Sequence, residues 1–317
     1  MKAITIHEYG GPDILIYEDV SKPEPGQNEL LIQIHAAGVN PADRQIRAGL
    51  RGKQKEPFSM ILGLDVSGVV ESLGDRVSGF KIGDEVYGML PQKGGYAEYA
   101  TGPETAFALK PQSLDYIQAA ALPVASLTAW QSLFEAGNLS SGQKLLIHAA
   151  SGGVGHIAVQ LAKWKGAYVI GTASGRNEAF LRMLGVDQFI DYRSTRFDEV
   201  IRDVDLVLDF IPREVNAELD KLASETLERS WDIVKDGGVL VSICANPYSE
   251  SAAKRGVRAK YILAEPRGDQ LAKIANLVDK GYLKPHIEAV IPLKEANKAH
   301  KLSQEGRIRG KVVLKVG

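Results

Sequence analysis

The sequence predicts an α/β protein that combines a β-barrel-type domain with a doubly wound domain on a parallel sheet. Short β-type segments separated by turns fill residues 1–100. From Lys144 onward, apolar strands alternate with helices. Between residues 144 and 155, the sequence KLLIHAASGGVG leads from an apolar strand through a glycine-rich turn into a helix. These three observations place the parallel sheet in the second half of the chain.

Length and composition limit the function classes. The chain has 317 residues, 44% hydrophobic and 24% charged, with a net charge of −1. This length predicts two domains, and the mixed charge excludes the basic stripe of a nucleic-acid-binding protein. No apolar run is long enough to span a bilayer, and residues 1–6 predict a strand rather than a signal peptide. We therefore expect a cytoplasmic protein with no nucleic-acid or membrane partner.

The N-terminal segments are typical of a small β domain. The expected strands are residues 3–7, 14–18, 30–35, 68–71, 85–87 and 96–99. Turn sequences such as GGPD and PEPG separate them. Strands this short predict a compact β-barrel-like domain and not a parallel sheet.

The following segments alternate between helix and strand. Residues 116–137 predict a helix that is interrupted at Pro123. The expected strands are residues 145–149, 168–172, 204–210 and 239–243, and the expected helices are residues 154–164, 177–184 and 215–231. Because these strands are almost continuously apolar, we expect helices on both faces of a parallel sheet.

The C-terminal segment stops this alternation. Residues 269–280 predict a helix and residues 310–316 a closing strand. A tail this short is too small for a domain of its own, so we expect it to rejoin the N-terminal β domain. The predicted domains are residues 1–121 with 265–317, and residues 122–264.

The glycine-rich turn predicts a phosphate-binding site. Gly152 is expected to permit a tight turn, and Gly155 to let the helix pack closely on the strand. The N–H groups at the start of the helix then face outward, where they can hold a pyrophosphate. The strand–turn–helix context separates this pattern from an isolated glycine motif. A glycine-rich turn of structural origin is the alternative.

The segment after the next strand favours NADP over NAD. NAD-binding folds carry an acidic residue about 20 positions after the start of the glycine pattern. Residues 169–177 hold no acid, and Ser174 and Arg176 stand there instead. A hydroxyl and a guanidinium bind a 2′-phosphate, which a carboxylate would repel. Alternatively, Arg176 only lies at the start of the next helix.

The sequence offers no ligands for a metal. Cys244 is the only cysteine, which excludes an internal disulfide and a cysteine-rich zinc site. None of the six histidines forms a spaced pair on one helix, and His148 is interpreted as a packed or cofactor-facing residue. Chemistry is therefore expected to rest on hydride transfer and electrostatic positioning.

Several segments together resemble the medium-chain dehydrogenase/reductase superfamily, in its zinc-independent quinone oxidoreductase and enone reductase branch. They are AGVNPAD at 37–43, GLDVSGVV at 63–70, GGYAEY at 94–99, AASGGVG at 149–155, IDY at 190–192 and GRIRGK at 306–311. The resemblance implies a GroES-like β domain, a Rossmann domain inserted into it, and NADPH in the cleft. Zinc-dependent relatives carry a cysteine at the position of Asn40 and a histidine at that of Leu64, so both ligands are replaced.

The resemblance also implies site residues. Asn40 would be catalytic, beside the nicotinamide or the substrate carbonyl. Cofactor binding is assigned to Thr128, Ser151, Gly152, Gly153, Val154, Gly155, Ser174, Arg176, Tyr192, Cys244, Arg309 and Lys311. In this assignment, Gly152–Val154 line the pyrophosphate, Ser174, Arg176 and Tyr192 surround the 2′-phosphate, and Arg309 or Lys311 closes over the cofactor.

Each role has a structural alternative. Asn40 could form an Asx turn before Pro41, Thr128 could back-bond within its helix, and Tyr192 could be an ordinary half-buried aromatic residue. Residues 43–47 lack the tyrosine of some relatives, and Asp65 is expected to accept backbone N–H bonds. A proton would then come from water.

These features together predict an NADPH-dependent reductase of quinones or α,β-unsaturated carbonyls that needs no metal. Zinc-assisted alcohol dehydrogenation and an NADPH-binding redox sensor or ζ-crystallin-like binder without turnover are the alternatives. Loops at residues 47–58 and 248–260 are expected to line the substrate pocket. Relatives often dimerise through the edge of the nucleotide sheet, so a homodimer is one expectation and the oligomeric state stays open.

Overall fold

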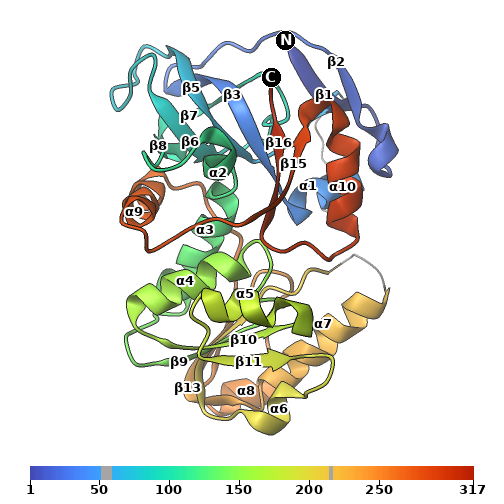
Figure 1. Ribbon diagram of the computed structural model, residues 1–317, viewed down its shortest axis with the longest axis vertical. Coiled ribbons are helices and arrows are strands. Elements are labelled where there is room, and N and C mark those ends of the chain that lie inside the picture. The colour runs from blue at the N-terminus through green and yellow to red at the C-terminus, as the bar shows by residue number, and fades with distance from the viewer. Residues whose placement is uncertain (51–58, 214–216) are drawn as a thin grey trace. The chain divides into compact units, whose positions relative to one another are not determined.

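The computed structural model describes residues 1–50, 59–213 and 217–317 (Figure 1). These residues form two compact units, Met1–Leu127 with Glu265–Gly317, and Thr128–Ala264. Part of the predicted substrate-pocket loop, residues 51–58, and the start of the predicted helix at residue 215 lie outside the described residues. Within the described ranges, no helix is both long and apolar enough to cross a membrane.

The first unit is built on a seven-stranded sheet that takes strands from both ends of the chain. Its order is β15 (Ile287–Pro292), β16 (Lys311–Lys315), β3 (Glu29–Val39), β5 (Asp65–Leu73), β6 (Glu85–Met89) and β8 (Phe107–Leu109), and β7 (Tyr99–Pro103) also pairs with β3. Figure 1 shows the C-terminal β16 beside the N-terminal β3, and the two strands are antiparallel. The tail therefore completes the N-terminal sheet.

A smaller sheet and four helices complete this unit. The sheet contains β2 (Ile16–Asp19), β1 (Lys2–Ile6) and β4 (Met60–Ile61). The helices are α1 (Pro41–Arg47), α2 (Tyr116–Ala120), α9 (Gly268–Asp279) and α10 (Ala296–Gln304). Side chains such as Ile32, Leu62, Val66 and Leu314 form one buried core between the sheets and α10. The hydroxyl of Tyr87 donates to the carbonyl of Leu271 and ties α9 to the main sheet.

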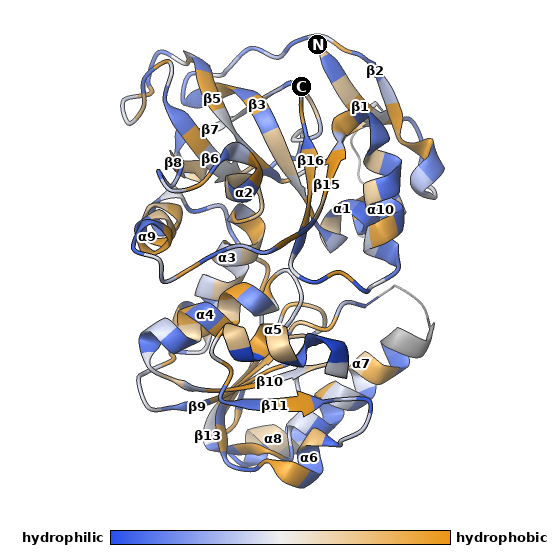
Figure 2. Cartoon of the chain, in the orientation of Figure 1, coloured by the Kyte–Doolittle hydropathy of each residue, from blue (hydrophilic) through white to orange (hydrophobic). Residues whose placement is uncertain are grey.

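The second unit is a six-stranded parallel sheet with helices around it. The strand order is β11 (Gln188–Asp191), β10 (Tyr168–Ala173), β9 (Lys144–Ile147), β12 (Val204–Asp209), β13 (Val234–Ser242) and β14 (Arg258–Tyr261). The helices are α4 (Gly155–Lys165), α5 (Glu178–Met183), α6 (Phe197–Val200), α7 (Ala217–Ser230) and α8 (Glu250–Lys254). Figure 2 shows hydrophobic strands in the sheet and mixed colouring on the helices around it. Most residues of β9, β10 and β12 are buried, as is the second half of β13, which confirms the predicted burial of these strands on both faces.

The strand order of this sheet contains a point at which the direction of winding reverses. Chain order runs outward from β9 to β10 and β11 on one side, and from β12 to β13 and β14 on the other. The direction of winding thus reverses between β9 and β12. In doubly wound sheets, ligands bind outside the carboxyl ends of the strands at this switch point.

The segment predicted as one interrupted helix is two helices and a π-helical stretch. Asp115 caps α2 by accepting a hydrogen bond from the N–H of Gln118. A new helix, α3 (Pro123–Trp130), begins at Pro123 itself, because proline is well tolerated at the first position of a helix. The π-helical stretch Gln131–Ala136 follows. Short 3-10 turns occur at Pro12–Ile14, Glu104–Ala106, Gly175–Asn177 and Leu293–Glu295.

Candidate active site

Three strands of the first unit bring three polar side chains together. Asn40 follows the last residue of β3, Asp65 begins β5 and Lys311 begins β16. The register pairs Val39 with Val312 and Gly38 with Asp65. Because β3 lies between β16 and β5, these strand ends meet, and residues that are far apart in sequence become neighbours.

The three side chains form a closed triangle of hydrogen bonds. Nζ of Lys311 donates to Oδ1 of Asn40 (2.5 Å) and to Oδ2 of Asp65 (2.9 Å). Nδ2 of Asn40 donates to the same Asp65 oxygen (2.9 Å). The side chains of Lys311 and Asp65 are only 4% and 0% exposed. The other Asp65 oxygen accepts the backbone N–H of Val124 (2.6 Å), so it accepts a backbone bond as expected and also pairs with a lysine.

The Asn40 side chain lies in a capping box at the start of α1, facing the backbone N–H of Asp43, which is a local role close to the predicted structural alternative. Its amide is directed to Lys311 and Asp65, while its backbone N–H donates to Oδ2 of Asp43 (2.8 Å). Asn40 is thereby the extended residue that precedes α1, and Pro41 takes the first helical position. The local fold holds the Asn40 backbone, and the Asn40 side chain belongs both to the capping box and to the buried triangle.

A second buried chain of polar groups starts at Asp43. Oδ2 of Asp43 accepts the Tyr96 hydroxyl (3.0 Å), Tyr96 lies 3.3 Å from Nε2 of His300, and Nδ1 of His300 lies 2.8 Å from Arg47. Burial raises the pKa of Asp43 to about 6 and raises that of Tyr96 well above its usual range. Burial, with Arg47 nearby, lowers the pKa of His300 to about 3. Sequence reasoning missed this chain, although Asp43 and Tyr96 both lie in segments that carry the resemblance.

The glycine-rich turn of the second unit leaves backbone donors open. In the part of the chain that the structure describes, no group accepts the N–H of Gly153, Val154 or Gly155. A Cβ on Gly155 would lie 2.3 Å from the carbonyl oxygen of Ala149, so only glycine fits at the start of α4. The left-handed backbone in this turn falls on Ala149 (φ 53°). Gly152, the residue predicted to permit the turn, closes it by donating its N–H to the carbonyl of Ala149 (3.0 Å).

The predicted 2′-phosphate residues lie at the carboxyl ends of adjacent strands. Ser174 follows β10 and Tyr192 follows β11, and the N–H of Tyr192 donates to the carbonyl of Ala173 (3.3 Å). Arg176 is exposed in the 3-10 turn after Ser174. An acid that the sequence argument overlooked also lies here: a Cβ on Gly175 would be 2.7 Å from Oδ2 of Asp191.

A further polar group lies at the ends of β12 and β13. Asp209 is fully buried and accepts the Ser242 hydroxyl (2.9 Å), while Oγ of Ser242 accepts the N–H of Cys244 (3.1 Å). Burial raises the pKa of Asp209. The backbone of Cys244 is therefore held at the carboxyl end of β13. An acid at the end of an apolar strand was the signal for this group.

The other predicted residues have these positions. Thr128 lies buried in α3, and Ser151 is buried in the turn before α4. The backbone N–H of Arg309 donates to Glu288, before β16. The side chain of His148 is packed between Thr172 and Ser230, at 3.1 and 3.0 Å, and burial lowers its pKa to about 3. His148 is therefore a packed residue, one of the two predicted roles.

Comparison with known proteins identifies the family. A family model described as an alcohol dehydrogenase GroES-like domain matches residues 26–112, and one described as a zinc-binding dehydrogenase matches residues 184–314. The structure of the quinone oxidoreductase from Coxiella burnetii is 38% identical, covers 100% of this chain and 99% of that chain, and has a TM-score of 0.91. The chain belongs to the medium-chain dehydrogenase/reductase superfamily, in its quinone oxidoreductase branch.

Two further relatives show the range of chemistry in this superfamily. A 2-methylene-furan-3-one reductase from Solanum lycopersicum is 33% identical over 99% of this chain and 79% of its own length. The quinone oxidoreductase from Escherichia coli, solved in complex with NADPH, is 26% identical, covers 99% of this chain and 100% of that chain, and has a TM-score of 0.84. The predicted fold class, a GroES-like domain with a Rossmann domain, is confirmed. The chain is an oxidoreductase of a family that uses NAD(P)H.

The name of the family model raises the question of zinc, and the residues present do not fit it. Zinc prefers thiolate, imidazole and carboxylate ligands in tetrahedral geometry. Here Asn40 and Asp65 already hold an ammonium between them, and Leu64 has no ligating atom. A divalent cation at this place would lie against the charge of Lys311. Among the described residues, no group of three His, Cys, Asp or Glu side chains could hold a metal.

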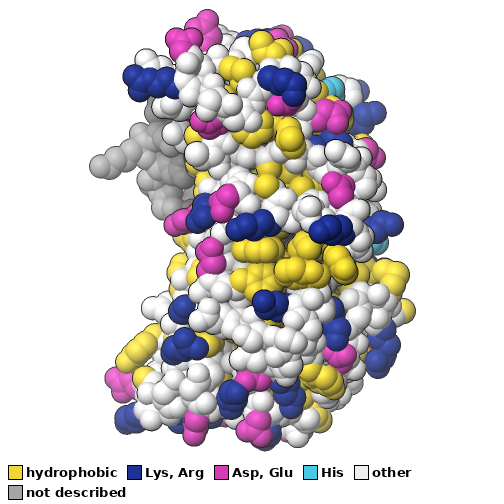
Figure 3. All heavy atoms as spheres, turned by 90° about the vertical axis from the view of Figure 1, so that its left-hand side faces the viewer, with side chains coloured by type: hydrophobic (Ala, Val, Ile, Leu, Met, Phe, Trp, Pro, Cys, Tyr) yellow, Lys and Arg dark blue, Asp and Glu magenta, His cyan; other side chains and the backbone are white. Residues whose placement is uncertain are grey.

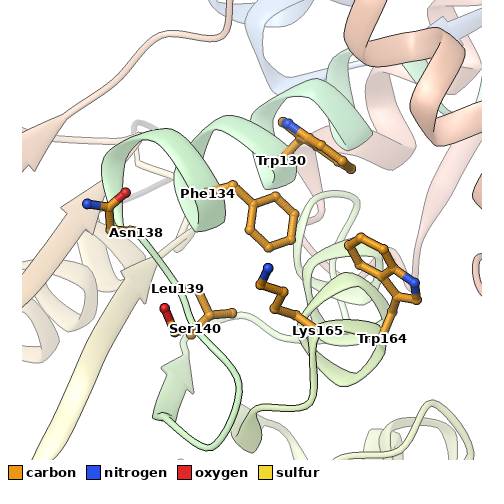
Figure 4. A pocket seen from close by; sticks show the side chains of 7 residues that line it. All are labelled: Trp130, Phe134, Asn138, Leu139, Ser140, Trp164 and Lys165. Atoms are coloured by element: carbon orange, nitrogen blue, oxygen red, sulfur yellow. The ribbon is translucent and has the colours of Figure 1, made fainter.

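One surface pocket is lined by none of the predicted site residues. This pocket of about 560 Å³ lies between Trp130, Phe134 and Trp164, with Lys165 and residues 138–140 around it (Figure 4). It is an aromatic corner, with ring centroids 4.8 to 6.4 Å apart. On the face drawn in Figure 3, basic and acidic side chains are interspersed.

Proposed function

We propose that the protein is an NADPH-dependent reductase that transfers hydride to quinones or α,β-unsaturated carbonyls without a metal. The observation that carries the proposal is the Lys311–Asn40–Asp65 triangle. It supplies a buried amide donor, next to a fixed cation, at the position where zinc-dependent relatives carry a metal ligand. A substrate oxygen there would meet a hydrogen-bond donor instead of a Lewis acid.

This donor suits conjugated acceptors. When hydride adds to a quinone or an enone, the negative charge spreads through the conjugated system onto oxygen, and a hydrogen bond stabilises it. A simple alcohol needs stronger polarisation of its oxygen, which metal ions supply in other enzymes. A relative named quinone oxidoreductase and one named 2-methylene-furan-3-one reductase support the two substrate classes.

The residues of the second unit support binding of NADPH. Bound NADPH supplies the hydride. The N–H groups of Gly153, Val154 and Gly155 would hold its pyrophosphate, and Ser174, Arg176 and Tyr192 its 2′-phosphate. The NADPH in the Escherichia coli relative supports this choice of cofactor. Asp191 acts against it, because a carboxylate beside Gly175 disfavours a phosphate.

In the proposed mechanism, the chain acts mainly by position and charge. Asn40 would donate an N–H to the substrate oxygen and hold it while negative charge develops. Asp43, the buried acid next to the triangle, already accepts the Asn40 N–H and the Tyr96 hydroxyl. Water would therefore deliver the proton to the product. Orientation of the reacting atoms would supply much of the rate.

The test is NADPH oxidation by purified protein with a panel of quinones, enones and saturated ketones. We expect turnover with one or both conjugated classes and none with saturated ketones. Asn40→Ala reports on the site, and Asn276→Ala, on the exposed surface of α9, is the matched control. NADPH binding without turnover of any substrate would instead favour the redox-sensor alternative.

A further inference from the structure

We propose that Lys311 is a positioning residue for catalysis, acting through Asn40. It fixes the orientation of the Asn40 amide and strengthens the amide as a donor toward the substrate oxygen. This inference rests on the proposed function. It differs from the predicted role of Lys311, which was to close over the cofactor.

The first step is the orientation of the amide. Its oxygen faces the Lys311 ammonium at 2.5 Å, and its nitrogen faces the Asp65 carboxylate at 2.9 Å. Turning the amide over would place an NH₂ group against an ammonium and a carbonyl against a carboxylate. The charges on both sides therefore select one orientation.

The second step is the number of hydrogen bonds that the Asn40 amide nitrogen donates. An asparagine amide has two N–H donors, and Asp65 takes one. Among the residues that the structure describes, no second acceptor lies on Nδ2 of Asn40. The remaining N–H is thus left for a ligand, although the Asn40 residue is only 4% exposed.

The third step is polarisation. An ammonium on the carbonyl oxygen of an amide favours the resonance form in which that oxygen is negative and the nitrogen positive. The N–H groups of the same amide then become stronger donors, as in other chains of hydrogen bonds at low dielectric. Because Lys311 is nearly inaccessible to water, solvent screens this effect little.

The fourth step is rigidity. Lys311 is held at the start of β16, where its N–H donates to the carbonyl of His286 (3.0 Å). Asp65 is anchored by the N–H of Val124 at 2.6 Å. The triangle therefore joins β3, β5, β16 and the start of α3, and each member has a fixed backbone. Such support is what a donor to a developing charge requires.

The test is a mutant cycle on the full-length protein with NADPH and 1,4-naphthoquinone. Lys311→Gln alone would leave Asp65 charged and unpaired, so the variant used is Lys311→Gln/Asp65→Asn, which keeps the charge balanced. We expect this variant and Asn40→Ala each to lower kcat about 10²–10³-fold, the range for removal of one oxyanion donor. In the triple variant, kcat should be no lower than in Asn40→Ala alone, because Lys311 acts through Asn40.

Cofactor affinity separates this role from direct binding of NADPH. The Kd for NADPH, from fluorescence titration, should be unchanged in Lys311→Gln/Asp65→Asn. A large increase would assign Lys311 to the cofactor and overturn the inference. So would a triple variant in which the two losses in kcat multiply. A fully active Asn40→Ala protein, or a wild-type protein that reduces no acceptor, would contradict the proposed function itself and with it the inference on Lys311.

A measurement on the wild type covers the case in which the variants do not fold. In protein labelled with ¹⁵N at asparagine, NMR should find one side-chain amide with two well-separated, slowly exchanging protons. One of these signals should shift when NADP⁺ and 1,4-naphthoquinone are added together. Absence of any protected asparagine amide would contradict the triangle and the inference with it.

Discussion

Nζ of Lys311 lies 2.5 Å from Oδ1 of Asn40, although 271 positions separate them in the sequence. The contact exists because the C-terminal strand pairs with β3. A residue near the end of the chain thus sets the surroundings of the candidate catalytic amide near its beginning. The C-terminal tail is therefore part of the proposed chemistry as well as of the fold.

Removal of the amide is the first prediction. Asn40→Ala should lower kcat with quinones or enones by about 10²–10³, which corresponds to loss of one oxyanion donor. The KM for NADPH should change little, because the cofactor residues lie on other elements. Steady-state kinetics check both values, and Asn276→Ala should behave as wild type. A fully active Asn40→Ala protein would remove Asn40 from the mechanism.

Cofactor choice is the second prediction. Arg176→Glu should weaken NADPH binding by about 1–3 kcal/mol, the scale of hydrogen bonds to charged groups, and NADH binding far less. Arg76→Glu makes the same charge change at an exposed position of the first unit and is the control. Titrations with NADPH and with NADH measure the ratio of the two dissociation constants. If Arg176→Glu leaves that ratio where it was, the phosphate pocket has been misplaced.

The glycine-rich turn gives a third prediction. In Gly155→Ala, the new Cβ would lie 2.3 Å from a backbone oxygen, whereas in Gly152→Ala it would lie at 3.3 Å. Gly155→Ala should therefore lose about 1–3 kcal/mol of stability through overpacking, and Gly152→Ala should lose much less. Urea unfolding followed by circular dichroism compares them. Equal stability of the two variants would contradict the tight packing at the start of α4.

Buried histidines give a fourth prediction. Burial lowers the pKa of His148 and of His300 to about 3, whereas an unfolded histidine titrates near 6.5. Between pH 6.5 and 3 the unfolded chain binds more protons, so the free energy of unfolding should fall as the pH is lowered through this window. His148→Gln should reduce the slope, because it removes one of these two buried imidazoles. An unaltered slope in His148→Gln would rule out a neutral buried imidazole.

Asp43 gives a fifth prediction with the opposite sign. Burial raises its pKa to about 6, above the unfolded value near 3.9. The folded state therefore binds the extra proton, and the contribution of Asp43 to stability is lost as the pH rises from 4 to 6. Asp43→Asn should gain on the order of 2–3 kcal/mol relative to wild type between pH 4 and 7. Asp75→Asn, at an exposed position, is the control and should show no such gain in stability. If Asp43→Asn also gave no gain, the raised pKa of the buried Asp43 carboxyl would be contradicted.

The sequence predicted the elements that repeat a strong local pattern. The apolar runs at β9, β10 and β12 and the turn into α4 were predicted to within a few residues. Strands β11, β14 and β15 were not predicted, because polar residues such as Gln188, Arg258 and Glu288 interrupt their apolar pattern. Their place comes from pairing with neighbouring strands, which local sequence does not encode.

The site residues also divide into those that local sequence predicts and those that depend on strand pairing and packing. Local motifs indicated Asn40 and the glycine turn. The partners of Asn40 could not be derived, because the Lys311 and Asp65 contacts depend on the register of three strands. Asp43, Tyr96 and His300 were missed for the same reason: each looks ordinary in sequence, and only packing makes them neighbours.

The central claim is that NADPH reduces quinones or enones here without a metal. Its most direct test uses protein freed of metal by prolonged dialysis against a chelator and measures the rate of NADPH and NADH oxidation with these acceptors. The account predicts that this protein still oxidises NADPH with quinones or enones at the full rate, and that NADH supports far less turnover. Activity that returns only when zinc is added, or equal efficiency with NADH and NADPH, would contradict it.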